Sequence, residues 1–307
     1  MSVSLLLRLV VLAMIWGGSF LFMRIAVPVF GTGFTAAGRL ALAAVALLAF
    51  AALQGSRVNF RANWKAYLWI GALSASIPFL LFAFSAHHLP AGYSAVLNAT
   101  VPLFAVLLGW YLHKQRPSLS KFVGVVVGLA GVVTIARFGT VTLTALTFLS
   151  FAGGLVAAML YAVGAAEVRR LFATTDPVAV ATGSQTGAAL LLLPLLVLDV
   201  PTTVPALAPS LALVALGLVC TAVAFVMYFR ILREAGPERG TTVTFMVPVF
   251  AQVWGAVFLH EAVTWAIVLG LGLVLFAVAL VFEKVKLPRR RSAVVLQAAI
   301  APCVRDK

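Results

Sequence analysis

The sequence predicts an all-α membrane protein with ten transmembrane helices arranged as two inverted five-helix repeats. Three observations predict it: the composition, ten apolar runs, and an internal repeat. Of the 307 residues, 63% are hydrophobic and only 10% are charged, whereas soluble domains are about 45–50% apolar and about 25% charged. With a mean hydropathy of +1.13, this composition excludes a soluble globular fold. Ten spans of about 21 residues need roughly 210 positions, which leaves no room for a large extramembrane domain.

The apolar runs are continuous, without the alternation of barrel strands, so each predicts a helix. The first run is too long for the apolar region of a signal peptide and has no evident cleavage site, so we expect it to be retained as a helix. The ten runs lie at residues 9–29, 34–54, 66–86, 91–112, 119–136, 146–166, 178–198, 209–229, 241–259 and 263–282.

The basic residues predict the topology. Of the 22 Lys and Arg residues, all lie in alternate loops or tails on one side except Arg24 and Arg39, within spans, and Arg137, in an opposite loop. Because positive charge is retained in the cytoplasm, both termini are expected there, in the inner or plasma membrane. The Lys and Arg residues lie between apolar runs and do not form a patch on a water-exposed domain, so nucleic acid is not an expected partner. The expected surroundings are the lipid bilayer. The basic tail, residues 284–307, is expected to anchor this topology, or alternatively to bind anionic lipid.

A repeat becomes visible when the sequence is shifted by 146 residues. The fourth span then overlays the ninth without a gap, and one Pro and two Gly are among the matches: Val101, Pro102, Phe104, Ala105, Gly109 and Gly124 meet Val247, Pro248, Phe250, Ala251, Gly255 and Gly270. Gly71 also meets Gly217. This predicts one repeat over residues 1–140 and a second over residues 141–283. Five spans per repeat is an odd number, so the second copy is expected to be inverted. Inverted repeats are typical of alternating-access carriers.

Several motifs together resemble the EamA-type drug/metabolite transporters: Trp16 to Phe20 (WGGSF), Leu89 to Gly92 (LPAG) followed by Pro102, and His260-Glu261 before a Gly-rich last span. The resemblance covers nearly the whole chain. It implies ten helices, cytoplasmic termini, a central cavity, and export or exchange of a small metabolite or amphiphilic compound. It also implies that the wall of the cavity includes Trp16, Ser19, Tyr161, Tyr228 and Gln252. The chain departs from the family at Gln115, where members often have Glu.

Charged residues within the spans are candidates for a gate or a charge site, because a charge in hydrocarbon costs roughly 2.5–3.5 kcal/mol. Arg39 either faces the cavity or snorkels toward the headgroups, and its repeat equivalent Gln185 is the expected polar partner. Arg24 is expected to be an interface anchor. No Asp or Glu is expected at mid-span, and only Glu261 is placed to join a gate, a helix-end cap being the alternative. Proton antiport, exchange and uniport all stay open.

Two prolines predict a central binding site. Pro102 and Pro248 have no amide hydrogen, so the carbonyls of Asn98 and Thr244, four residues earlier, lack their helical bonds. These two residues are equivalent in the repeat. Their polar groups need partners in hydrocarbon, and a bound solute would supply them. The alternative is that each is satisfied locally.

No enzyme, cofactor or metal is expected. The chain has no nucleophile elbow, phosphate-binding loop or zincin motif, and adjacent His87 and His88 cannot share a helix face. The glycines of 124–131 and 270–272 are expected to allow close packing of the fifth and tenth spans. The sequence therefore favours a secondary transporter. A non-transporting membrane protein, either an intramembrane enzyme or a scaffold, and a passive channel are the alternatives, and a homodimer stays open.

Overall fold

The computed structural model describes residues 3–114, 117–201, 204–235 and 243–282, and all regular structure within those ranges is helical. In chain order the elements are α1 (Val3–Leu53), α2 (Phe60–Gly71), the π-helix η1 (Ala72–Ser76), α3 (Ile77–His88), α4 (Ala91–Asn98), α5 (Val101–His113), α6 (Leu119–Phe138), α7 (Ala145–Leu171), α8 (Pro177–Leu192), α9 (Leu195–Leu198), α10 (Leu207–Gly217), the π-helix η2 (Leu218–Val223), α11 (Ala224–Ala235), α13 (Val243–Leu259) and α14 (Trp265–Val281). Gln115 and the predicted tail at 284–307 lie outside the described residues.

Six helical stretches of the described chain are long and apolar enough to cross a membrane: Val3–Leu53, Phe60–His88, Ala91–Tyr111, Leu119–Phe138, Ala145–Leu171 and Leu207–Tyr228. The shorter helices Val243–Leu259 and Trp265–Val281 are also apolar. The fold is therefore that of a polytopic helical membrane protein.

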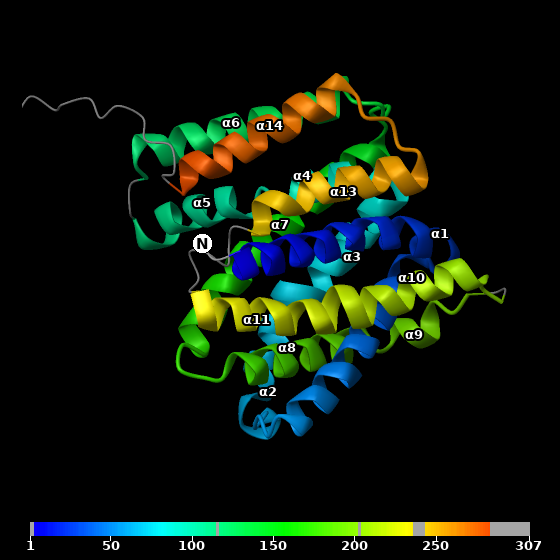
Figure 1. The fold of residues 1–307 in the computed structure, drawn as a ribbon, viewed down its shortest axis with the longest axis vertical. Helices are drawn as coiled ribbons and strands as arrows, with labels where there is room; N and C mark the ends of the chain where they lie inside the picture. The colour runs from blue at the N-terminus through cyan, green and yellow to red at the C-terminus, as the bar shows by residue number, and fades with distance from the viewer. Residues whose placement is uncertain (1–2, 115–116, 202–203, 236–242, 283–307) are drawn as a thin grey trace, which may run out of the picture.

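The bundle has two distinguishable ends (Figure 1). The start of α1 and the end of α14 lie at the same end, and the connections α9–α10 and α13–α14 lie at the other, which we call the distal end. Several helices of the bundle run side by side between these two ends.

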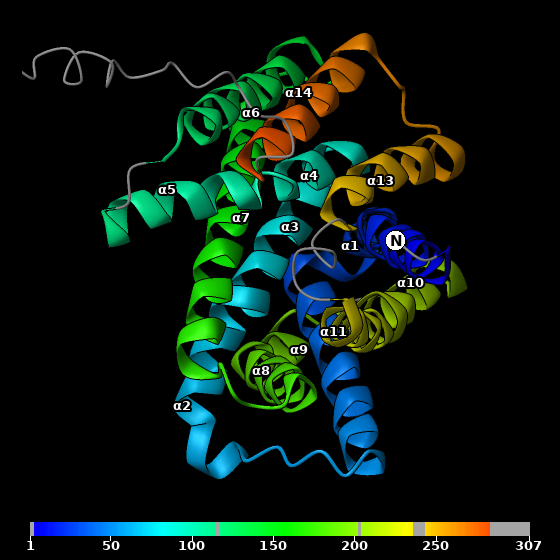
Figure 2. The same ribbon diagram turned by 60° about the vertical axis from the view of Figure 1, so that its left-hand side comes forward.

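α1 contains both of the first two predicted spans, because the chain reverses within it at Gly31. This glycine has φ 74° and ψ 170°, a left-handed region that side chains with a Cβ rarely adopt. The carboxylate of Asp199 accepts hydrogen bonds from the amides of Gly33 (3.0 Å) and Phe34 (3.2 Å), and so caps the second half of α1. Figure 2 shows the second half turning away from the first. The predicted boundary between the spans, residues 29–34, coincides with this turn.

Two π-helices interrupt the third and eighth predicted spans at matching places. η1 follows Gly71 and η2 follows Gly217, and these positions are related by the same 146-residue offset. In each π-helix a side-chain hydroxyl donates a hydrogen bond to the carbonyl five residues earlier: Ser76 to Gly71 (3.3 Å) and Thr221 to Leu216 (2.8 Å). π-Helical turns often mark functional sites.

The two prolines of the repeat behave differently. The fourth span breaks at Ala99 and Thr100, between α4 and α5, so Pro102 lies in the first turn of α5, where its missing amide is not needed. The Asn98 carbonyl is thus at a helix end rather than within a continuous helix. Pro248, in contrast, lies inside the uninterrupted helix α13.

α6 and α14 pack along each other as a pair at the edge of the bundle (Figures 1 and 2). A Cβ added at Gly124 would lie 2.9 Å from the carbonyl oxygen of Ala277, and one at Gly131 would lie 2.8 Å from that of Gly270. The predicted packing through these glycines is confirmed. Gly272 faces open space, so its inclusion in the packing surface is wrong.

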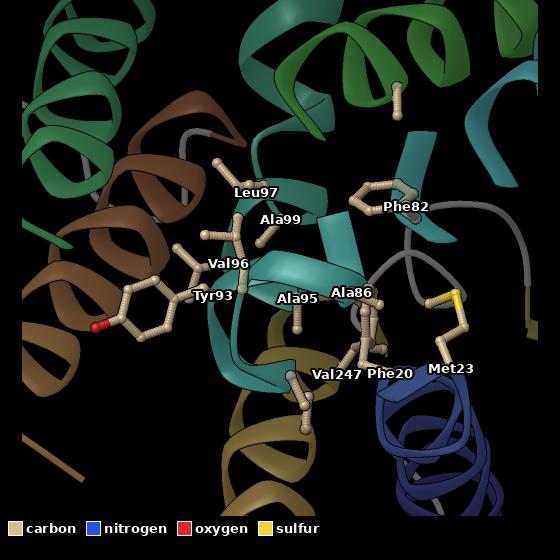
Figure 3. Packing of buried hydrophobic residues seen from close by; sticks show 14 of the residues in the cluster. Phe20, Met23, Phe82, Ala86, Tyr93, Ala95, Val96, Leu97, Ala99 and Val247 are labelled. Carbon is tan, nitrogen blue, oxygen red and sulfur yellow. The ribbon is translucent and has the colours of Figure 1, made fainter. Parts of the chain in front are cut away.

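The main core surrounds the first half of α1. Figure 3 shows Phe20 and Met23 of α1 near Phe82 of α3, with the α4 residues and Val247 of α13 completing the cluster. Elements from both predicted repeats therefore share one core.

Candidate functional site

Arg39 lies in the interior of the bundle, with only 6% of its surface exposed. Its Nε donates a 2.8 Å hydrogen bond to the hydroxyl of Thr221 in η2, and its Nη1 lies 3.9 Å from the sulfur of Met23. The guanidinium carbon is 3.8 Å from the centre of the Phe79 ring in α3, a cation–π contact. Arg39 does not snorkel, because its charge ends among buried side chains instead of at the surface.

The described residues offer Arg39 no carboxylate. Their five acidic side chains all bind other groups: Glu167 binds Trp69 and Arg170, Asp176 binds Ser56 and its own helix, Asp199 caps α1, Glu234 pairs with Arg8, and Glu261 pairs with Arg24. A buried guanidinium without a counter-ion is costly unless something else compensates its charge.

Aromatic rings from both halves of the chain belong to the main core or pack against it. The ring centres of Trp16 (α1) and Tyr228 (α11) are 5.2 Å apart, and those of Phe82 (α3) and Tyr161 (α7) are 6.1 Å apart. Phe82 also contacts Phe20 edge-on at 5.8 Å, and Tyr161 packs against the cluster that contains Phe79. Three of the residues implied by family resemblance, Trp16, Tyr161 and Tyr228, thus pack against the main core, in two separate groups of rings. Ser19 is buried one turn along α1 from Trp16.

Gln185 of α8 is 2% exposed, and its Oε1 has no hydrogen-bond partner in the described part of the chain. The structure does not pair it with Arg39, contrary to the sequence expectation. Thr221 takes that role.

A second polar cluster lies at the distal end. Both carboxylate oxygens of Glu261 accept a hydrogen bond from the amide of Ala91, at 3.1 and 2.9 Å, and Oε1 also lies 3.3 Å from Nε of Arg24. Nη1 of Arg24 donates to the carbonyl of Ala86 at the end of α3 (2.8 Å). Glu261 therefore caps the N-terminus of α4 and forms an ion pair with α1 at once. Arg24, expected as an interface anchor, is the partner in this pair.

Gln252 of α13 lies next to this cluster, at the start of α4. It is 9% exposed, its Oε1 has no partner among the described residues, and that atom approaches Gly92 in the first turn of α4. Gln252 thus lies at the start of α4, beside the residue whose amide Glu261 caps.

Asn98 and Thr244 are both half-buried. Asn98 ends α4 and Thr244 begins α13, two helices that pack on each other. The described residues contain no group of three or more His, Cys, Asp or Glu placed to hold a metal ion.

Sequence reasoning missed Thr221, Phe79 and Met23 as neighbours of Arg39, and Arg24 as the partner of Glu261. The signal for Thr221 was weak: it is a lone hydroxyl in an apolar run, four residues after the Gly217 that matches Gly71. The signal for Arg24 was clearer, since an arginine and a glutamate at the same predicted end of two spans can pair.

Comparisons with known proteins agree on one family. A family profile described as the EamA-like transporter family matches the chain twice, at residues 3–137 and 148–283. The chain is 28% identical over 276 residues to the uncharacterized inner membrane transporter YedA of Escherichia coli K12, covering 88% of each chain. It is 28% identical over 290 residues to a probable terminal-alkyne amino-acid exporter of Streptantibioticus cattleyicolor, covering 93% of this chain and 95% of that protein. A solved crystal structure with 22% sequence identity has the same fold, with a TM-score of 0.64 over 91% of this chain and 96% of that one.

Proposed function

Because the chain belongs to the EamA-like transporter family, we propose that it is a secondary transporter that moves a small organic metabolite or amphiphilic compound across the inner or plasma membrane by alternating access. In this proposal ten spans form two inverted repeats, residues 1–140 and 141–283. The central site lies where the repeats meet.

One observation carries this proposal: a buried cation is held between elements of both repeats. Arg39 comes from the first repeat, and its hydrogen-bond partner Thr221 comes from a π-helix of the second. A solute that binds at such a shared centre can be exposed to either side when the repeats exchange conformations. Such a position has no obvious purpose in a scaffold.

The pairing of helices supports inversion. The third span of the first repeat packs on the first span of the second repeat. Ser85 of α3 donates a 2.8 Å hydrogen bond to the carbonyl of Ser150 of α7. The eighth span packs on the first in the same way, with the Cys220 thiol 3.3 Å from the carbonyl of Ile15. The matched π-helices, η1 and η2, occupy equivalent positions within these pairs.

The distal cluster supplies a gate. In the observed conformation Glu261 holds Arg24 of α1 and the start of α4 together, with its own side chain only 9% exposed. Opening this end requires the ion pair to separate. The repeat equivalent of Arg24 is Arg170, which pairs with Glu167 of its own helix, and the equivalent of Glu261 is Gln115. The ion pair of Arg24 and Glu261 is therefore not repeated at the equivalent positions, and the gate that we propose is specific to the distal end.

We place the distal end outside the cell and both termini in the cytoplasm, from the distribution of basic residues. We also propose outward transport. The relative that is named as a probable exporter supports outward transport.

The test is a metabolite screen. A strain that overexpresses the protein is supplied with a panel of amino acids and amphiphilic compounds, and their distribution between cells and medium is measured against the same strain with an empty vector. The proposal expects at least one compound to be depleted from cells only by the wild-type protein. If no compound in the panel differs between the two strains, the carrier proposal is contradicted.

A further inference from the structure

We propose that Arg39 and Thr221 form a subsite for a carboxylate, so that the transported solute is a small carboxylic acid with an apolar or aromatic portion. This inference rests on the proposed carrier function and names the substrate class that the central site would take.

The first step concerns charge. Arg39 is 6% exposed and its immediate contacts are a hydroxyl, a thioether and a phenyl ring. None of these carries a negative charge, and the five described carboxylates are committed elsewhere. An arginine stays protonated at all physiological pH values. No group among the described residues balances this charge, and an anion that enters the site would do so.

The second step concerns hydrogen bonds. A guanidinium has five N–H donors, and within the described residues Arg39 makes one good hydrogen bond, from Nε to Thr221. The contact of Nη1 with the Met23 sulfur at 3.9 Å is weak. No oxygen of the described residues thus occupies the outer edge of the guanidinium, which is formed by Nη1 and Nη2. That edge matches the two oxygens of a carboxylate, which it binds in parallel.

The third step concerns orientation. Phe79 covers one face of the guanidinium at 3.8 Å, and Thr221 fixes the Nε edge. The Thr221 hydroxyl donates its own hydrogen to the Leu216 carbonyl at 2.8 Å, so its oxygen faces Arg39 as an acceptor. The plane of the guanidinium is fixed before a ligand arrives, which reduces the entropy lost on binding.

The fourth step concerns the rest of the solute. The rings nearest to Arg39 are those of Phe79 and, packed beside it, Tyr161 and Phe82, which present mainly apolar faces, and no second cation contacts Arg39 among the described residues. An acid with an apolar body fits this combination better than a polyanion such as a sugar phosphate, which needs several positive charges.

The experiment compares acids with their neutral amides, which have nearly the same shape. Wild-type protein in lipid nanodiscs is titrated at neutral pH with phenylacetate and phenylacetamide, and with butyrate and butyramide, and binding is followed as the shift in unfolding temperature. We expect at least one acid to bind about tenfold or more tightly than its amide, since a charge-assisted bidentate contact is lost in the amide.

Variants assign this preference to the site. Arg39→Gln should reduce the acid-to-amide preference about tenfold, Arg39→Lys should keep part of it, and Thr221→Val should reduce it by about threefold. Arg137→Gln is the matched control, because Arg137 is an exposed arginine at the end of α6, and it should leave the preference unchanged.

Three results would overturn the inference. One is the absence of any acid preference in the wild-type protein, including no binding by either acid. Another is a preference that survives in Arg39→Gln. The third is an equal Arg39-dependent stabilisation by sodium chloride alone, which would make this a site for any small anion. Each leaves the carrier proposal to the metabolite screen, which would fail separately if no compound were moved.

Discussion

The ion pair between Arg24 and Glu261 predicts how the two conformations are balanced. The charged atoms are 3.3 Å apart, with side-chain exposures of 29% and 9%. At an effective dielectric constant of about 20, this separation corresponds to a gross attraction of about 5 kcal/mol. Partial solvent screening and the cost of desolvation reduce the net stabilisation to about 1–2 kcal/mol. Loss of the pair should therefore raise the ratio of distal-open to distal-closed protein about 5–30-fold.

The perturbation is the replacement of each partner by Gln. Glu261→Gln removes the charge but keeps an amide oxygen that can accept from Ala91, so the cap of α4 is preserved. The assay is the rate at which a membrane-impermeant thiol reagent labels Gln252→Cys from outside, in a Cys220→Ala, Cys303→Ser background. Gln252 is 9% exposed next to the cluster, so its labelling reports opening.

We expect Arg24→Gln and Glu261→Gln each to raise the labelling rate about 5–30-fold, and the double variant to raise it no further. Arg137→Gln serves as the control for loss of an exposed arginine. Unchanged rates, or effects of the two single variants that multiply in the double variant, would refute the assignment of this pair as a gate.

Three further predictions concern packing, topology and the solute. Gly71→Val should lower the unfolding temperature, because an added Cβ would lie 2.6 Å from the backbone of Ala188 and Ser184, which costs about 1–3 kcal/mol of stability. Gly272→Val is the control, since Gly272 faces open space. Equal unfolding temperatures for the two variants would contradict the packing argument. Cys303 should be protected from an impermeant thiol reagent in intact cells and react after permeabilisation, and labelling in intact cells would reverse the topology. Asn98→Ala and Thr244→Ala should each change apparent substrate affinity more than membrane abundance, whereas wild-type kinetics in both would remove them from the binding site.

Much of the fold could be predicted because hydrophobic runs and repeated Pro and Gly residues are local signals. The run boundaries near 30–34 and 87–91 coincide with the reversal at Gly31 and the start of α4. The packing at Gly124 and Gly131 was predictable since small residues on one helix face permit close approach. Gly272 shares that composition but points elsewhere, and only the helix rotation decides this.

The candidate site was harder to predict because its contacts join distant segments. Arg39 and Thr221 are 182 residues apart, and the offset that aligns the repeats pairs Arg39 with Gln185 instead. A two-fold relation brings a residue to its own equivalent only on the symmetry axis, and elsewhere each side chain contacts non-equivalent residues, as Arg39 contacts Thr221. The depth of Arg39 in the bundle could not be predicted either, because its distance from the helix end was unknown and snorkelling stayed open. The turn at Gly31 places Arg39 two helical turns inside.

The different breaks at Pro102 and Pro248 illustrate a further limit. Both prolines remove the same backbone bond, yet α4 ends before Pro102 while α13 continues through Pro248. A missing amide can be accommodated by a helix start or by a local distortion. The neighbouring packing chooses between them.

The central claim, alternating access to a centre shared by both repeats, is tested most directly by the accessibility of that centre from each side. In a Cys220→Ala, Cys303→Ser background, Thr221→Cys is exposed to an impermeant thiol reagent in right-side-out and in inside-out vesicles. The measurement is repeated in a protein that also carries Arg24→Cys and Glu261→Cys joined beforehand by a short bifunctional thiol reagent. The account predicts labelling from both sides without the cross-link and only from the cytoplasmic side with it. Protection from both sides in the uncross-linked protein, or labelling from both sides after cross-linking, as a channel would show, would contradict it.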